Sequence, residues 1–173
     1  CLYTERSSSY STIAAIGKVV PQLLPLEPSV LEYLDETFLR FVGDISDGAA
    51  GLLMVEFEGE ESDPLPEKLR EARRILRPHS TDLLEATDRR SLEGLWSIRH
   101  GASPTMAKLG DERRSIQVVE DGCVPVEALA RYLTLVREAG QRHGVELVIF
   151  GHAGDGNLHV NLLPDITRSG WEK

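Results

Sequence analysis

The sequence predicts an α+β fold in which a mainly antiparallel sheet carries helices packed on one face, in a ferredoxin-like arrangement. Helical and strand patterns alternate along the chain in the order α-α-β-α-β-α-β-α-β-β, without a βαβ phosphate-loop motif. The last two strands flank a short turn, which is typical of an antiparallel hairpin. The length of 173 residues corresponds to one domain, and 41% hydrophobic with 27% charged residues is ordinary for a globular protein.

The first third of the chain is predicted to form two helices and a strand. Residues 11–20 carry apolar side chains at helical spacing, and Pro21 is expected to end or kink that helix. Residues 28–42 show the same spacing at Leu31, Leu34, Phe38 and Phe41 and predict a second helix. The apolar run at residues 52–57 predicts a buried strand.

Two further helices and a strand are predicted in the middle of the chain. Asp63 and Pro64 begin a helix whose apolar stripe is Leu65, Leu69, Ala72 and Leu76. Residues 81–87 predict a strand. Asp88 is expected to cap the next helix, whose inner face carries Leu92, Leu95, Trp96 and Arg99.

The last third begins with a loop rich in Gly, Ser, Pro and charge, at residues 101–114, which we expect to be mobile. Residues 115–120 predict a strand. Pro125 begins a long helix that Gly144 ends, and the hairpin follows.

Composition excludes several functions. The formal net charge of −9 argues against nucleic-acid binding, because phosphate contacts need clustered Lys and Arg. No run of 18 apolar residues is present, so no membrane span is expected. Two cysteines are too few for a disulfide framework, which makes a cytoplasmic location the default.

The most informative stretch is residues 151–161, Gly-His-Ala-Gly-Asp-Gly-Asn-Leu-His-Val-Asn. Asp155 and Gly156 are the preferred pair for a two-residue turn with positive φ at both centres. Such a turn places His152 directly opposite His159. Directly opposed residues have Cβ atoms about 5 Å apart, which lets two imidazoles bind one metal ion.

Strand alternation separates the hairpin into a polar and an apolar face. The polar face carries His152, His159, Asn157 and Asn161, and the apolar face carries Ile149, Leu158, Val160 and Leu162. The density of polar groups favours a metal or ligand site. The alternative is that each histidine is an ordinary surface residue beside a Gly-rich turn.

Two charged segments outside the hairpin leave alternatives open. Arg99 extends an apolar helix face, so it either snorkels or forms a structural salt bridge, or it binds a substrate carboxylate through its guanidinium fork. The acidic segment 120–125, Glu-Asp-Gly-Cys-Val-Pro, is more simply explained by capping of the helix that follows it than by contact with another domain.

The run His-Ala-Gly-Asp-Gly-Asn-Leu-His at residues 152–159 resembles the signature of the FAD-linked oxidase C-terminal domain. That domain caps flavoenzymes of the vanillyl-alcohol oxidase type, including D-lactate, glycolate and D-2-hydroxyglutarate dehydrogenases. Residues 95–99, Leu-Trp-Ser-Ile-Arg, and the segment 120–125 agree with the family in the right order. The resemblance covers the chain from about Ser11 to its end.

The resemblance implies that residues 1–173 are a C-terminal cap and substrate domain of a longer flavoenzyme, an oxidoreductase that converts a D-2-hydroxy acid to the 2-oxo acid. FAD would be bound mainly by a domain of the same polypeptide that precedes Cys1. His152 and His159 would bind a divalent metal, Zn²⁺ or a similar ion. Arg99 and Asn161 would hold the small hydroxy-acid substrate. Such a protein would be cytoplasmic, or peripheral to the membrane in its full-length form.

The chain departs from the family pattern in two respects. The third metal ligand, a glutamate, and the histidine that acts as base would follow Lys173, so no catalytic residue is assigned here. A lysine that some members carry before the Asp-x-x-Val-Pro segment is absent. We therefore expect that this fragment alone neither binds FAD tightly nor turns over substrate.

Two other functional classes compete with this interpretation. One is a stand-alone metal or small-ligand binding module on a ferredoxin-like scaffold. The other is a metal-dependent hydrolase that uses the histidine pair and Asp155 as base. The hydrolase hypothesis is the weakest, because the turn itself requires Asp155.

Overall fold

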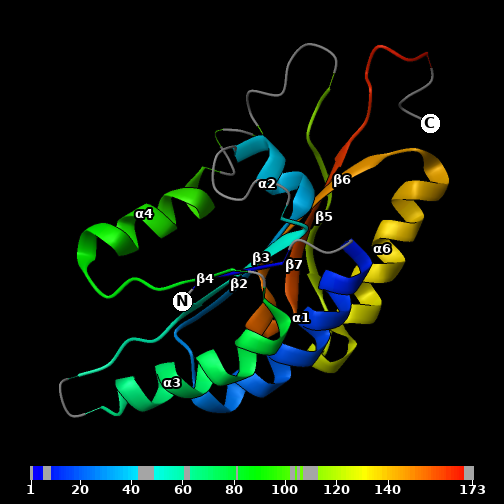
Figure 1. The fold of residues 1–173 in the computed structure, drawn as a ribbon. Helices are drawn as coiled ribbons and strands as arrows, with labels where there is room; N and C mark the ends of the chain where they lie inside the picture. Colours follow the sequence, from blue (N-terminus) through cyan, green and yellow to red (C-terminus); the bar gives the residue numbers. More distant parts are fainter. Residues whose placement is uncertain are drawn as a thin grey trace.

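A computed structural model of the chain describes residues 2–5, 9–42, 49–60, 63–80, 82–101, 104, 106 and 113–169, of which residues 2–5, 9–11 and 118–120 are described by their backbone alone. Seven strands form one sheet in the order β4-β1-β3-β2-β6-β7-β5 (Figure 1). Every strand pairing is antiparallel. The predicted α+β class with an antiparallel sheet is therefore confirmed. Most of the predicted loop at residues 101–114 lies outside the described residues.

The bounds of the strands and helices are as follows. The strands are β1 Leu2–Glu5, β2 Val30–Asp35, β3 Gly51–Glu56, β4 Asp82–Leu84, β5 Ile116–Cys123, β6 Glu146–His152 and β7 Asn157–Leu163. The α-helices are α1 Ser9–Leu23, α2 Glu36–Val42, α3 Leu65–Leu76, α4 Arg89–His100 and α6 Leu129–His143. Short 3₁₀ helices are η1 Leu24–Leu26, η2 Arg77–His79, η3 Val126–Ala128 and η4 Ala153–Asp155.

The helices form two layers of unequal size. The helices α1, α3 and α6 lie on one face of the sheet, as Figure 1 shows, and bury the larger apolar core against it. The helices α2 and α4 lie on the opposite face, where Phe38 and Ile98 pack over Leu34, Met54 and Val148. This second layer adds to the single helical layer that the sequence predicts. It covers the sheet face on which the candidate site lies.

The predicted helix at residues 28–42 is wrong over its first half. Residues 30–35 form β2, and the helix α2 begins only at Glu36. Asp35 ends the strand and caps the helix, because its Oδ1 accepts a hydrogen bond from the backbone N–H of Phe38 at 2.8 Å. Residues 31–35 are all buried, on both faces of the sheet, so the apolar residues Leu31 and Leu34 fit helical spacing as well as a strand.

The other predicted elements are found with shifted ends. Pro21 lies inside α1, which continues to Leu23 rather than ending at the proline. Asp88 caps α4 as predicted, since its Oδ1 accepts from the backbone N–H of Ser91 at 3.0 Å. Gly144 ends α6 in the left-handed conformation, as predicted. The strand β1, which lies between β4 and β3, was not predicted from the sequence.

A buried charged cluster joins β2 to α6 on the large-core face. Tyr33 and Asp35 are 0% exposed, and the Nη2 of Arg137 donates to the Oδ2 of Asp35 at 3.3 Å. Burial raises the pKa of Asp35 from 3.8 to about 6, although the charge of Arg137 opposes the change. The folded state therefore binds a proton at Asp35 more tightly than the unfolded chain does.

We expect Asp35→Asn to flatten the pH dependence of stability. The pKa is raised on folding, so the stabilisation from protonated Asp35 is complete below about pH 4 and is lost as the pH rises through about 6. The wild-type free energy of unfolding should fall by at most about 3 kcal/mol over this range through this one group. Urea denaturation at several pH values measures the difference between the two proteins.

Asp88→Asn is the matched control for this prediction. Asp88 is an exposed cap whose pKa is lowered by its hydrogen bonds with Ser91, so its contribution to the pH dependence has the opposite sign. If wild type and Asp35→Asn showed parallel stability profiles between pH 4 and 7, the raised pKa of Asp35 would be excluded.

Candidate substrate and metal site

The connection between β6 and β7 differs from the predicted turn. The strands pair His152 with Asn157 and Phe150 with His159, so the two histidines are not directly opposite. The loop contains four residues, 153–156, of which the first three form η4. Gly156 has φ 65°, as predicted for a glycine at this turn, but no positive φ occurs at Asp155. A two-residue turn with positive φ at both centres is therefore wrong.

Contact with a distant segment explains the longer turn. The carbonyl oxygen of Gly156 accepts a hydrogen bond from the backbone N–H of Val124 at 3.0 Å. A Cβ at position 156 would lie 2.0 Å from the carbonyl oxygen of Val124. The β5–η3 connection thus packs directly on the turn and requires a glycine there, a constraint that the local sequence does not reveal.

The two histidines nevertheless converge. His152 and His159 are diagonal neighbours on the same face of the hairpin, and their ring centroids lie 5.7 Å apart at an interplanar angle of 80°. The Nδ1 of His159 lies 3.5 Å from the Oδ1 of Asp121 on β5. The side chain of His159 is 20% exposed and that of His152 is 49% exposed. The predicted convergence on one face is therefore what the structure shows.

Glu32 on β2 is the central residue that the sequence analysis missed. The β2–β6 register places it directly opposite His152, and its Oε1 forms a short contact with the Nδ1 of that histidine. Its Oε2 accepts a hydrogen bond from the Nε of Arg99 on α4 at 2.7 Å. Glu32 is only 4% exposed. One buried carboxylate thus joins a histidine and an arginine that belong to other parts of the chain.

Arg99 lies on the same sheet face as the histidines. Its guanidinium carbon lies 5.0 Å from the ring centroid of Phe150, in a cation–π arrangement, and its side chain is 18% exposed. The ring of Phe150 lies 5.4 Å from that of His159. Arg99 therefore forms a salt bridge with Glu32, which is one of the alternatives that the sequence left open. Its guanidinium also lies close to Phe150, which is next to His159.

Asn161 lies two residues after His159 on β7, on the same face of the strand. It is 6% exposed, and its Oδ1 accepts a hydrogen bond from the hydroxyl of Ser115 at 3.3 Å. Its buried Nδ2 has no hydrogen-bond partner among the residues that the structure describes. An unsatisfied buried amide donor is costly, which makes this group a candidate contact for a ligand.

Asp121 has a different role from the predicted helix cap. The Oδ1 of Asp121 accepts a hydrogen bond from the Nδ2 of Asn157 at 3.2 Å. The same oxygen lies beside the ring of His159. Both η3 and α6 begin without a side-chain cap.

Strand alternation in the sequence would have placed Phe150 on the histidine face. No comparable signal indicated Glu32, because its segment was assigned to a helix.

A cleft of about 310 Å³ opens beside His152. It is lined by Glu32, His152, Asp155, Val30 and Trp96, together with residues of η1 and β2. The cleft is therefore large enough for a small carboxylic acid. Its polar lining residues are Ser29, Glu32, His152 and Asp155.

The donor set fits a metal ion only in part. Two imidazoles converge, and each has a carboxylate beside its Nδ1, which is the usual outer-sphere arrangement around metal-bound histidines. Within the described ranges, however, no group of three or more His, Cys, Asp or Glu side chains is arranged to hold a metal. Among the described residues, the two histidines are therefore the only ligand pair that converges here.

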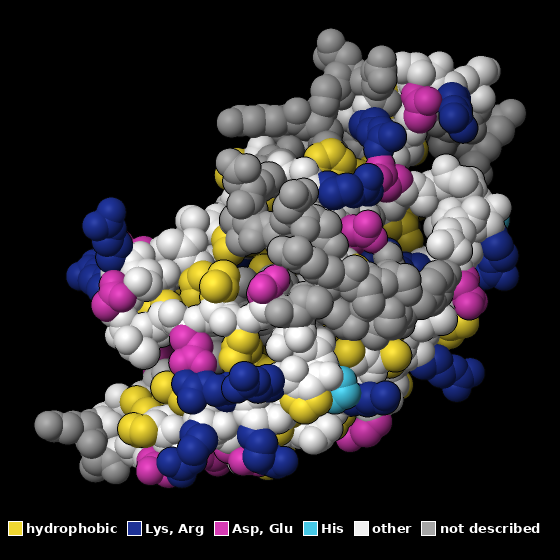
Figure 2. All heavy atoms as spheres, in the orientation of Figure 1, with side chains coloured by type: hydrophobic (Ala, Val, Ile, Leu, Met, Phe, Trp, Pro, Cys, Tyr) yellow, Lys and Arg dark blue, Asp and Glu magenta, His cyan; other side chains and the backbone are white. Residues whose placement is uncertain are grey.

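The surface is mixed in charge. On the face that Figure 2 shows, the Lys and Arg side chains of the described residues are interspersed with Asp and Glu rather than gathered in one basic patch. Among the helices that the structure describes, none has the length and apolarity needed to cross a membrane.

The fold and the site define a class: an α+β domain whose antiparallel sheet brings an arginine, a buried carboxylate and two histidines together on one face. The comparison with known families agrees with the sequence motif. The chain belongs to the family of FAD linked oxidases, C-terminal domain, whose model matches residues 7–173.

Curated relatives carry names of 2-hydroxy-acid enzymes. The chain is 29% identical over 167 residues to D-lactate dehydrogenase of Archaeoglobus fulgidus, an alignment that covers 92% of this chain and 34% of that protein. It is 25% identical over 170 residues to glycolate oxidase subunit GlcD of Escherichia coli K12, covering 94% and 33%. It is 28% identical over 130 residues to D-2-hydroxyglutarate dehydrogenase of Haemophilus influenzae, covering 71% and 13%. The chain thus spans about one third of the length of the first two relatives.

Proposed function

We propose that this chain is the substrate- and metal-binding domain of an FAD-dependent oxidoreductase that converts a D-2-hydroxy acid to the 2-oxo acid. The observation that carries the proposal is the convergence of Arg99, His152 and His159 on one sheet face. Family membership and the relatives' names support the reaction class. FAD, held mainly by another domain of the same polypeptide, supplies the two-electron acceptor when bound.

Arg99 is proposed to bind the carboxylate of the substrate. Glu32 accepts from the Nε of Arg99, so the two terminal amino groups form the remaining donor edge of the guanidinium. A carboxylate can accept two parallel hydrogen bonds from such an edge. The aromatic ring of Phe150 and the carboxylate of Glu32 hold the guanidinium in place.

Asn161 is proposed to donate a hydrogen bond to the substrate. Its Nδ2 is buried and has no partner within the described residues, and it lies on the same face of β7 as His159. A substrate oxygen would satisfy this donor. The cost of leaving the amide unpaired would then be recovered on binding.

His152 and His159 are proposed to supply two ligands to a divalent metal, most simply Zn²⁺. The carboxylates of Glu32 and Asp121 lie beside the Nδ1 atoms of the two rings, an arrangement in which Nε2 is the ligand atom of each neutral imidazole. A bound ion supplies Lewis acidity that lowers the pKa of the substrate hydroxyl. The further ligand is proposed to come from outside the described residues.

Arg99→Lys in the complete polypeptide tests the carboxylate clamp. Lysine keeps the charge but loses the two-point geometry, so we expect KM for D-lactate or glycolate to rise about 10- to 100-fold with a smaller change in kcat. Initial rates with a panel of D- and L-2-hydroxy acids and an artificial electron acceptor measure this. Arg131→Lys, an exposed arginine of α6, is the control.

The same assay tests the reaction class. Oxidation of a D-2-hydroxy acid with weak activity on its L-enantiomer is the expected result. If the complete polypeptide oxidised none of the acids, the proposed reaction would be rejected. If Arg99→Lys left every KM unchanged, the proposed contact between Arg99 and the substrate carboxylate would be rejected.

A further inference from the structure

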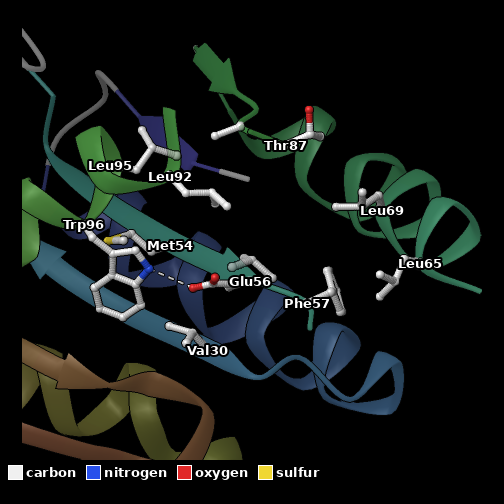
Figure 3. A pocket seen from close by; sticks show the side chains of 12 residues that line it. Val30, Met54, Glu56, Phe57, Leu65, Leu69, Thr87, Leu92, Leu95 and Trp96 are labelled. Carbon is white, nitrogen blue, oxygen red and sulfur yellow. Dashed lines mark hydrogen bonds between the residues drawn. The ribbon is translucent and has the colours of Figure 1, made fainter. Parts of the chain in front are cut away.

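A second cavity, of about 200 Å³, lies between α3, α4 and the adjoining ends of β2 and β3 (Figure 3). Leu92, Leu95 and Trp96 of α4 form one wall, and Leu65 and Leu69 of α3 lie at the far end. Among its twelve lining residues only Glu56 and Thr87 are polar. The cavity is thus suited to an apolar group.

This cavity adjoins the cleft beside His152, which belongs to the proposed substrate site. Val30 and Trp96 line both the apolar cavity and the cleft beside His152. Met54 lies directly opposite Glu32 in the β2–β3 register, and Val30 lies two residues before Glu32 on the same strand face. Two residues of a strand span about 7 Å. The apolar cavity therefore begins within the length of a few carbon atoms of the carboxylate that contacts Arg99 and His152.

A negative charge lies at the wall of this cavity. Glu56 is paired with Val30 in the strand register, and its Oε2 accepts a hydrogen bond from the Nε1 of Trp96 at 2.9 Å (Figure 3). The indole therefore holds the carboxylate at the cavity. A ligand with a second carboxylate at its far end would meet a like charge there.

We propose that the apolar cavity is the side-chain pocket of the substrate site and takes the carbon chain of a 2-hydroxy monocarboxylic acid. The inference rests on the proposed function and narrows its substrate class. It favours a substituent of about four carbons over glycolate and lactate, because each buried methylene adds to binding. It also disfavours 2-hydroxyglutarate, whose distal carboxylate would face Glu56.

The test compares kcat/KM of the complete polypeptide for D-2-hydroxyhexanoate, glycolate and D-2-hydroxyglutarate. We expect wild type to prefer hydroxyhexanoate over glycolate by at least about tenfold. Leu92→Trp fills the cavity from α4 and should lower that preference about tenfold. Leu69→Trp fills it from α3 and should act in the same direction, which guards against a misfolded single variant. Leu135→Trp, on an exposed position of α6, is the matched control and should keep the wild-type preference.

Glu56→Gln tests the charge separately. Glutamine keeps an oxygen that can accept from the Trp96 indole, so it removes the charge with little change in shape. The ratio of kcat/KM for hydroxyglutarate to that for hydroxyhexanoate should rise about fivefold or more.

The outcomes separate the two proposals. Equal activity on glycolate and hydroxyhexanoate, or equal effects of the Leu92 and Leu135 variants on their ratio, overturns the side-chain pocket and leaves the proposed function intact. Absence of activity on every 2-hydroxy acid removes both proposals. Circular dichroism and thermal melting of each variant establish that it is folded.

Discussion

Replacement of Glu32 by alanine is expected to lower the free energy of unfolding of this chain by about 3–5 kcal/mol. The carboxylate is almost fully buried and contacts Arg99 and His152, which come from α4 and β6. Alanine leaves the largely buried guanidinium of Arg99 without its partner, and the cost of an uncompensated charge dominates. Urea denaturation of wild type and variant measures the difference.

A double-mutant cycle identifies the source of this loss. Glu32→Met combined with Arg99→Met removes both charges and keeps apolar volume, so it should cost less than the sum of the two single replacements. Glu93→Ala is the matched control, because Glu93 forms an exposed salt bridge with Arg89 whose loss should cost less than about 1 kcal/mol. A cost for Glu32→Ala no greater than for Glu93→Ala would show that the buried pair does not organise this face.

Replacement of His152 or His159 by alanine should reduce kcat/KM of the complete polypeptide by about 10²- to 10³-fold. A metal that polarises the substrate hydroxyl contributes several kcal/mol to transition-state stabilisation, and each variant removes one of the two proposed ligands. Steady-state oxidation of the preferred 2-hydroxy acid measures the effect. His143→Ala, at an exposed position in the last turn of α6, should retain wild-type rates.

Metal content distinguishes a ligand role from a structural one. Elemental analysis should find about one divalent ion per complete polypeptide and a large loss of it in the His152 and His159 variants, with His143→Ala unchanged. Chelation should abolish activity, and added Zn²⁺ or a related ion should restore it. Full activity after chelation, or an unchanged metal content in both variants, would contradict the proposed metal role.

The shared face of the two histidines follows from the sequence even though the predicted register was wrong. Both the predicted two-residue loop and the observed four-residue loop contain an even number of residues. Side chains alternate with a period of two, so this change of register moves each partner by two positions but keeps His152 and His159 on one side. The face was therefore predictable, whereas the partners His152–Asn157 and Phe150–His159 were not.

Glu32 shows where the sequence was insufficient. Its segment is buried on both faces of the sheet, so apolar residues at positions 31 and 34 satisfy helical and strand spacing alike. Arg99 and His152 lie 67 and 120 residues away along the chain. Only the pairing of β2 with β6 and the packing of α4 bring these three side chains together.

The sequence by itself determined the α+β class, the caps at Asp88 and Gly144 and the common face of the two histidines. These features depend on local spacing and backbone preference, which act within a few residues. The tertiary structure alone decided the second helical layer, the length of the turn before Gly156 and the buried carboxylate between Arg99 and His152. Each of these depends on contacts between segments far apart in the chain, for which no local pattern supplies a signal.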